Sequence, residues 1–317
     1  MFNREKYRLL CKQHEEIPLF SKAWWLDAVA GENGWDVAIV EKNGDIIAAL
    51  PYVKKKKLAW TILTLPPLTQ NSFLWVKYPP NQKYERRLSY EKEIMFQLIE
   101  SLPRCHLFNL NFHHSMTNWL PFFWRGFSQT TRYTYIIDNL SDLDHIYTEF
   151  HNTVRKNIRK AEKSVEVVTD QDLEKFYHIN KLTFDRQGRK IPYPFELVQR
   201  LDEACGVRNC RKIYFAKDDQ ERIHAAVYIV WDERTAYYLM GGADPKLRNS
   251  GAMTLLLWEA MKDVSRTVEK FDFEGSMMEP IERFFRSFGA KQVPYFKVYK
   301  FYSVPLAIGY TLKGVIK

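Results

Sequence analysis

The chain has 317 residues, which is long enough for two domains of ordinary size. Hydrophobic residues make up 46% of it, so packed cores are expected and a largely disordered chain is excluded. The formal net charge of +9 favours an anionic partner, such as a phosphate, a nucleotide, RNA or an anionic membrane surface, without choosing among them. The charged first residues and four scattered cysteines, none in a metal or redox motif, predict a cytoplasmic protein with reduced thiols and no metal site.

An antiparallel meander is predicted near the start of the chain by three successive runs rich in β-branched and aromatic residues. These runs are WDVAIV (35–40), GDIIAALPYV (44–53) and AWTIL (59–63). The expected elements that follow are a helix over 90–100, a strand over 108–112, a helix around 120–127 and a strand over 133–137. This order predicts a mixed sheet with helices packed on it.

Residues 143–163 predict an additional helical segment rich in arginine and lysine. Arg155 and Arg159 share one helical face because they are four positions apart. Two interpretations remain open for this face, a phosphate-binding surface or an ordinary solvated one.

The second half repeats the order of the first. Its three strand-like runs cover 212–217, 221–230 and 236–240, at a constant offset of 177 residues from the first set. The expected elements that follow are a helix over 252–264, a strand over 271–275, a helix over 281–290 and a strand over 295–299. The fold class predicted is α/β (α+β), with two tandem domains over 1–139 and 140–317 that divide near Asn139.

Three segments carry a family resemblance: VRKNIRKAEKSVEV (154–167), YYLMGGADPKLRNSGAMTLLLWEAM (237–261) and FDFEGSM with IERFFRSFGA (271–290). In this order they resemble the GNAT acyltransferase superfamily. Within it the likeness is to the tandem-domain Fem-type aminoacyltransferases and the BioF-like acetyltransferase family associated with envelope polysaccharide synthesis. The resemblance implies two GNAT-like domains and transfer from acyl-CoA (such as acetyl-CoA) or from aminoacyl-tRNA, and both donors remain open. It also implies that the basic stretch with Arg155 and Arg159 lies near the phosphates of an acceptor.

A candidate donor site lies where a predicted strand passes into a helix. The connecting residues are Arg248, Asn249, Ser250, Gly251 and Ala252. The N–H groups at the start of a helix bind phosphate, glycine permits close approach of the backbone, and arginine adds a charged contact. The alternative is a simple helix cap formed by Asn249 or Ser250. Because the first half has no glycine between Gly44 and Gly126, its own donor site is expected to be degenerate.

The candidate catalytic base is one of two carboxylates. Strand alternation places Asp272 and Glu274 on one face, and the repeat aligns them with Asn109 and Asn111 in the first half. A carboxylate can take the proton of an attacking amine, and Glu274 is preferred because it lies nearer the end of the strand. The structural alternative is that both acids pair with neighbouring arginines.

Tyr238 is a candidate substrate-binding residue, although aromatic residues in such strands more often belong to the core. Lys54–Lys57 are expected at a solvated hairpin tip that could contact anionic lipid or RNA.

The function predicted is N-acyl transfer (acetyl or aminoacyl) to an amine of a phosphorylated acceptor, such as a nucleotide-sugar or cell-envelope precursor. One alternative is an inactive binding module for RNA or an anionic lipid-linked precursor. Another is a basic protein of the membrane surface that uses the lysine hairpin and residues 305–317 for peripheral contact.

Overall fold

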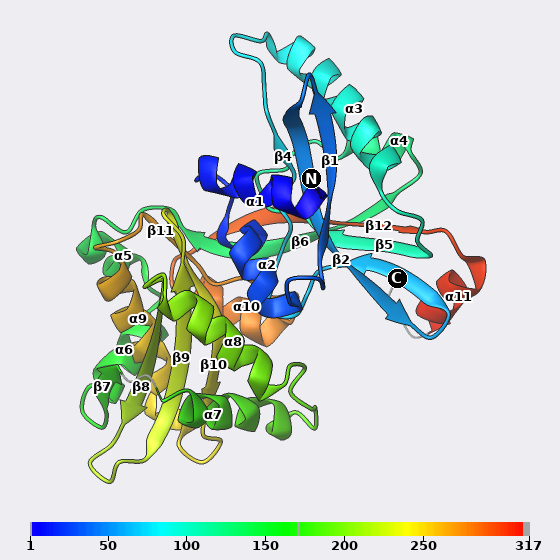
Figure 1. Ribbon diagram of the computed structural model, residues 1–317. Helices are drawn as coiled ribbons and strands as arrows, with labels where there is room; N and C mark the ends of the chain where they lie inside the picture. Colours follow the sequence, from blue (N-terminus) through cyan, green and yellow to red (C-terminus); the bar gives the residue numbers. More distant parts are fainter. Residues whose placement is uncertain (1, 170–171, 313–317) are drawn as a thin grey trace. The chain divides into compact units, whose positions relative to one another are not determined.

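The computed structural model describes residues 2–169 and 172–312, and its chain forms two compact units (Figure 1). Unit 1 comprises residues up to Arg132 together with those from Pro294 onward, and unit 2 comprises Tyr133–Val293. The predicted domains, 1–139 and 140–317, follow the sequence repeat, whereas these units follow contacts in space. The segment from Pro294 is where the two divisions differ most.

Unit 1 has a mixed sheet in the order β1-β2-β3-β5-β12, with β4 paired to β2. The strands are β1 (Asp36–Lys42), β2 (Asp45–Lys57), β3 (Trp60–Thr64), β4 (Trp75–Val76), β5 (Leu107–Asn111) and β12 (Lys291–Phe301). The helices are α1 (Asn3–Gln13), η1 (Leu19–Ser21), α2 (Ala23–Ala30), α3 (Tyr84–Ser101), α4 (Leu120–Trp124) and α11 (Val304–Leu312). Pairing is antiparallel except between β3 and β5, which are parallel.

Both faces of the unit 1 sheet are buried, because neighbouring residues of each strand point to opposite sides. Val37 and Ala49 pack in a cluster with α1 and α2. Ala38 and Leu50, one position further along, pack in a second cluster with α3 and α4. The short apolar runs seen in the sequence are therefore strands covered on two sides.

Unit 2 has a sheet in the order β6-β11-β10-β9-β8-β7. The strands are β6 (Ser128–Ile137), β7 (Glu166–Thr169), β8 (Arg211–Lys217), β9 (Ile223–Trp231), β10 (Thr235–Ala243) and β11 (Lys270–Asp272). The helices are α5 (Leu143–Glu149), α6 (Asn152–Ala161), α7 (Leu173–Arg186), α8 (Phe195–Gly206), η2 (Arg248–Ser250), α9 (Ala252–Val264) and α10 (Glu279–Arg286). The parallel pair in this sheet is β10 with β11.

Helices cover the two faces of the unit 2 sheet separately (Figure 1). Val227 and Ile229 of β9 lie in the same buried cluster as α9. Tyr228, between them, points to the other face, where its ring packs against Phe176 of α7 at 5.5 Å. The full burial of β9 explains why its sequence is a continuous apolar run without alternation.

The predicted basic helical segment over 143–163 is two helices, α5 and α6, separated by a break at Phe150 and His151. Phe150 is buried in the core, and the His151 N–H donates to the carbonyl of Ser287. Arg155 Nη1 donates to the Thr148 carbonyl at 2.8 Å, which satisfies an acceptor in the last turn of α5. The burial of Phe150 and the hydrogen bonds of His151 and Arg155 therefore end α5.

The last strand of each sequence half completes the sheet of the other unit. β12 ends the second half, yet its Lys297 pairs with Asn111 of β5 in unit 1. β6 ends the first half, yet its Ile136 pairs with Asp272 of β11 in unit 2.

The predicted element order, three strands followed by helix, strand, helix and strand, is present in both halves, with one additional short strand, β4, before the helix of the first half. The α/β class with mixed sheets flanked by helices is therefore confirmed. Over residues 2–169 and 172–312, no helix is both long and apolar enough to cross a membrane.

Candidate active site

The parallel pair β10–β11 of unit 2 is short, and the two strands part at one end. Pairing runs from Thr235 with Lys270 to Tyr237 with Asp272 and stops there. β10 continues to Ala243 along β9, with a register shift between Tyr238 and Met240. Beyond Tyr237, the edge of β10 that β11 would have covered has no strand partner among the described residues, so other groups can bind to it.

Helix α7 packs closely on the far part of this edge. Asn180 Nδ2 donates to the Gly241 carbonyl at 2.8 Å, and Tyr193 Oη donates to Asn180 Oδ1 at 2.8 Å. A Cβ atom at position 242 would lie 2.3 Å from the carbonyl oxygen of Ile179. Gly242 is therefore required by the approach of α7, and the glycine pair after β10 has a packing reason.

Asp272 is buried at the point where the strands part. Its Oδ1 accepts hydrogen bonds from the Thr134 hydroxyl and from the backbone N–H of Glu274, the latter at 2.8 Å. Burial raises the pKa of Asp272 to about 6, although these two hydrogen bonds act in the opposite direction. This pKa is close enough to neutral pH for the carboxyl group of Asp272 to gain or lose a proton.

Glu274 has a backbone conformation that is rare for a residue with a side chain. Its φ is 59°, in the left-handed region, and Gly275 follows with φ 58°. A Cβ atom at position 275 would lie 2.1 Å from the Tyr133 carbonyl oxygen, so glycine is needed there. Strained, buried, non-glycine residues of this kind are concentrated at functional sites, which supports the prediction for Glu274.

Two tyrosines lie within electrostatic range of Glu274. Burial raises the pKa of Tyr238 most, and the Glu274 charge raises it further. Burial also raises the pKa of Tyr193, to which Glu274 again contributes. Tyr238 Oη contacts Met253 Sδ at 3.6 Å, so this phenol lies beside the first turn of α9. Tyr238 therefore lies beside the start of α9, and the charge of Glu274 reaches it.

The predicted donor loop forms η2 and the start of α9. The helix begins at Ala252, after Gly251 with φ 85°, so neither Asn249 nor Ser250 is the N-cap residue expected from the sequence. Ser250 Oγ nevertheless accepts the Ala252 N–H at 3.3 Å. Arg248 is exposed.

Helix α6 packs directly on this loop. A Cβ atom at position 251 would lie 2.4 Å from the Asn157 carbonyl oxygen, and Lys160 Nζ donates to the Asn249 carbonyl at 2.5 Å. Gly251 thus has a packing role that the sequence analysis did not foresee. Arg159 is exposed on the same helix, whereas Arg155 is turned back toward α5.

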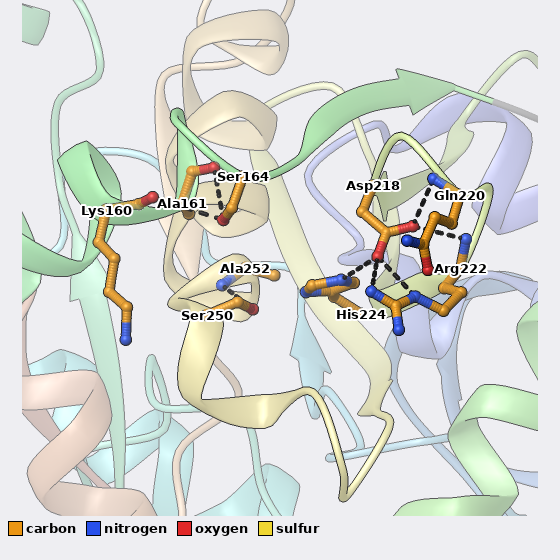
Figure 2. A network of polar contacts seen from close by, with 9 residues as sticks. All are labelled: Lys160, Ala161, Ser164, Asp218, Gln220, Arg222, His224, Ser250 and Ala252. Atoms are coloured by element: carbon orange, nitrogen blue, oxygen red, sulfur yellow. Dashed lines mark hydrogen bonds and ion pairs between the residues drawn. The ribbon is translucent and has the colours of Figure 1, made fainter.

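A second polar network stands next to the donor loop (Figure 2). Asp218, in the turn between β8 and β9, accepts hydrogen bonds from Arg222 Nε at 2.7 Å and from the Arg222 N–H at 2.9 Å. Its Oδ2 also lies 3.1 Å from Nε2 of the buried His224. The side chain of Arg222, and then that of His224, hold the pKa of Asp218 below its usual range. In Figure 2, His224 lies on the side of Asp218 that faces Ser250 and Ala252.

His224 is connected through its backbone to the segment that leads from β10 to the donor loop, because its carbonyl accepts the Asp244 N–H at 3.0 Å. Its Nδ1 atom is buried and forms no hydrogen bond with any residue in the described ranges. Sequence analysis did not identify His224, Asn180, Tyr193 or Lys160 as site residues. The spacing of Asp218, Arg222 and His224 was visible, but nothing in the sequence indicated that their turn lies beside the loop after β10.

Within residues 2–169 and 172–312, no three His, Cys, Asp or Glu side chains are grouped in a way that could hold a metal ion.

Comparison with known proteins places this site in a recognised fold. Residues 148–286 match the model of the acetyltransferase (GNAT) domain. The whole chain is similar to the crystal structure of FemX, with 14% identity, a TM-score of 0.66 and 98% of each chain covered. No curated protein sequence matches the chain.

Two further solved structures share the fold. One is the C-terminal domain of a protein described as a lysylphosphatidylglycerol synthetase from Agrobacterium fabrum, with 11% identity, a TM-score of 0.56 and coverage of 94% of this chain and 92% of that one. The other is a tandem GNAT protein of the clavulanic acid biosynthesis pathway, with 11% identity, a TM-score of 0.51 and 94% of each chain covered. At identities of 11–14%, these similarities show a shared fold and nothing more specific.

Proposed function

We propose that this chain, which has an acetyltransferase (GNAT) domain over residues 148–286 and shares the tandem fold of FemX, transfers an acyl or aminoacyl group to an amine. The single observation that supports this most is an asymmetry between the two halves. In the second half, a loop at a helix N-terminus accompanies two buried carboxyl residues, Asp272 and Glu274, where two strands part. At the positions that the repeat aligns with them, the first half has the neutral amides Asn109 and Asn111.

Glu274 is the proposed base. In the transfer step the amine nitrogen attacks the acyl carbonyl carbon, the C–N bond forms, and the bond from this carbon to the leaving sulfur or oxygen breaks. The amine proton passes to Glu274, directly or through water, and the leaving group takes up a proton. Asp272 acts as a positioning residue, because its Oδ1 already accepts from Thr134 and from the Glu274 N–H.

The donor would bind at the loop Arg248–Ala252. Helix N-termini bind phosphate, and positive charge is supplied by the exposed Arg248 of the loop and the exposed Arg159 of α6, the helix that packs on it. Both donor classes carry phosphate groups, so a phosphate-binding loop is compatible with acyl-CoA and with aminoacyl-tRNA.

The acceptor is proposed to be an amine on a phosphorylated molecule, such as a nucleotide-sugar or a cell-envelope precursor. Tyr238 and Tyr193 are the proposed acceptor-side residues, because both lie within electrostatic range of Glu274. A cytoplasmic location is part of the same proposal.

The test has two stages. Melting temperature is first measured with acetyl-CoA, longer acyl-CoAs, CoA and charged tRNA, because a ligand that binds only the native state raises it. Transfer from the donor so identified is then measured for wild type, Glu274→Gln and the control Glu259→Gln, which makes the same chemical change on α9. We expect Glu274→Gln to lower kcat by about 10²–10⁴-fold with an unchanged melting temperature. Wild-type rates in Glu274→Gln would remove Glu274 as the base.

If no donor raises the melting temperature and no transfer is detected, the alternative function stands. That function is an inactive GNAT-like module that binds RNA or an anionic lipid-linked precursor. It predicts binding of such a polyanion that is unchanged by Glu274→Gln, because no chemistry depends on the carboxylate.

A further inference from the structure

Unit 1 carries a protruding hairpin of unusual composition. β2 ends in Lys54–Lys57, and the turn to β3 is formed by Leu58 and Ala59. All four lysines are exposed, and within the described part of the chain none forms an ion pair. Successive strand residues point to opposite faces, so positive charge covers both sides of the hairpin. Leu58 at the tip is 94% exposed, which places an apolar side chain at the outermost point of a cationic surface.

The last described helix, α11, turns an apolar stripe toward solvent. Val304, Ile308 and Leu312 are four residues apart and therefore share one face, and they are 73%, 56% and 83% exposed. The helix has no charged residue, and none of its residues is buried. Helices of globular proteins normally turn such a stripe toward the core, so this orientation indicates a surface with a partner.

The hairpin and α11 lie at the same end of the unit 1 sheet. Lys56 pairs with Thr61 across the hairpin, and Thr61 exchanges hydrogen bonds with His106 at 2.8 and 2.9 Å. The His106 carbonyl in turn accepts the N–H of Tyr302 at 2.9 Å, two residues before α11 begins. This row of contacts runs from β2 and β3 to the residue before β5 and the residue after β12, and Figure 1 shows α11 beside the hairpin end. The lysines, Leu58 and the stripe therefore form one surface, termed here the basic-apolar surface.

We infer that the basic-apolar surface docks this protein on an anionic lipid bilayer. Lysines near such a membrane are attracted to its negative surface potential, and an apolar helix beside them can enter the boundary between headgroups and acyl chains. Because the described part of α11 turns an apolar stripe to solvent beside exposed lysines, it is placed along the membrane surface in this proposal. A nucleic acid would account for the lysines but would leave Leu58 and the stripe without a role. The docking surface lies in unit 1 and does not depend on the proposed transfer reaction.

The test is co-sedimentation of the full chain with vesicles of phosphatidylcholine alone and of phosphatidylcholine with phosphatidylglycerol. We expect binding to the anionic vesicles only, with a loss of at least tenfold when NaCl rises from about 0.1 to about 0.5 M. Lys55→Glu/Lys57→Glu should weaken binding at least tenfold, and Val304→Gln/Ile308→Gln at least fivefold, by estimates from the charge and apolar area removed. Leu58→Asn, which keeps the left-handed turn conformation, should also weaken it.

The matched control is Lys12→Glu/Lys42→Glu, which makes the same change in net charge at exposed lysines elsewhere in unit 1. It should bind vesicles like wild type, and a loss equal to that of Lys55→Glu/Lys57→Glu would show that only net charge matters and overturn the proposal.

Two other outcomes would also overturn it. In one, the protein binds single-stranded RNA but not vesicles. RNA binding then depends on the lysines and is the same for Val304→Gln/Ile308→Gln as for wild type. In the other, light scattering shows a wild-type dimer that Val304→Gln/Ile308→Gln converts to a monomer, without vesicle binding, so that the stripe is an interface between two copies. Acyl transfer assayed on a water-soluble acceptor is unaffected by these surface variants, so failure of docking and failure of the proposed function are separable.

Discussion

The carboxylate of Asp272 holds the backbone of Glu274: Oδ1 accepts the Glu274 N–H at 2.8 Å, and Glu274 has φ 59°. The bond spans two residues and is the kind of local contact by which aspartate stabilises a turn. Thr134 donates to the same oxygen from β6, so this turn is fixed from two elements. Asp272 therefore positions the turn that carries Glu274, and the proposed function assigns the role of base to Glu274.

Asp272→Asn should change how stability depends on pH. Burial raises the pKa of Asp272 from 3.8 to about 6, so the folded protein binds this proton more tightly than the unfolded chain. The free energy of unfolding should therefore fall as pH rises from about 4 to about 6, by at most roughly 3 kcal/mol, and change little above that range. Asparagine still accepts both hydrogen bonds but does not titrate. Urea denaturation across this pH range should show the variant gaining stability relative to wild type as pH rises, and parallel curves would contradict the shift.

Glu274→Gly and Glu274→Ala form a pair that measures backbone strain. Both remove the carboxylate and should abolish the proposed transfer. Only glycine adopts φ near 60° without steric penalty, so the glycine variant should be the more stable by about 1 kcal/mol. The comparison is made by urea denaturation at one pH, and an alanine variant of equal or greater stability would mean that the left-handed turn is absent in solution.

Gly251→Ala should destabilise unit 2 by about 2–4 kcal/mol, because its Cβ would meet the Asn157 carbonyl at 2.4 Å in addition to the left-handed φ of 85°. Gly44→Ala is the control, because Gly44 has φ 86° and no atom lies within 4 Å of an added Cβ. This variant should lose only the stability that the left-handed backbone costs alanine, about 1 kcal/mol. Equal losses of stability in the two variants would contradict the packing of α6 on the donor loop. Large substitutions at Gly251 are therefore a poor test of donor binding.

Ser250→Glu is a cleaner test of the donor site. A negative charge beside a helix N-terminus stabilises the free protein by about 0.3–1 kcal/mol but repels a phosphate bound there. The Kd of the anionic donor should rise about tenfold, equivalent to roughly 1.4 kcal/mol. Tyr84→Glu adds the same charge at the start of the equivalent helix α3, where Tyr84 is 76% exposed, and should leave the Kd unchanged. Titration calorimetry measures both, and equal Kd values for Ser250→Glu and wild type would argue against the loop as the phosphate site.

The order of elements was predictable because it depends on local signals. The run Asp36–Lys42 has β-branched residues and ends in the Asn43–Gly44 turn, and a second such pattern recurs 177 residues later. Which strand pairs with which was not predictable in the same way. The partnership of Lys297 with Asn111 joins residues far apart in sequence, and no local pattern records it.

The candidate site was predictable in part. Phe271 and Phe273 both lie in the core as expected, but the predicted strand over 271–275 is too long, because β11 ends at Asp272 and strand alternation does not reach Glu274. The left-handed conformation of Glu274 was not predictable, because a residue with a side chain carries no sequence sign of positive φ. Gly251 was identified as a site of close approach, but the sequence could not reveal that Asn157 of α6 is the group that approaches.

The exchange of last strands has a consequence for synthesis on the ribosome. The sheet of unit 1 includes β12, most of which emerges after the whole of unit 2, although the rest of unit 1 emerges before it. Unit 2 ends at Val293, so it can finish folding while the earlier unit still exposes the free edge of β5. A nascent chain stalled before Pro294 thus has a complete second unit and an open first one, and such an edge is prone to unwanted pairing. The order in which the two units mature is the reverse of the order in which they begin.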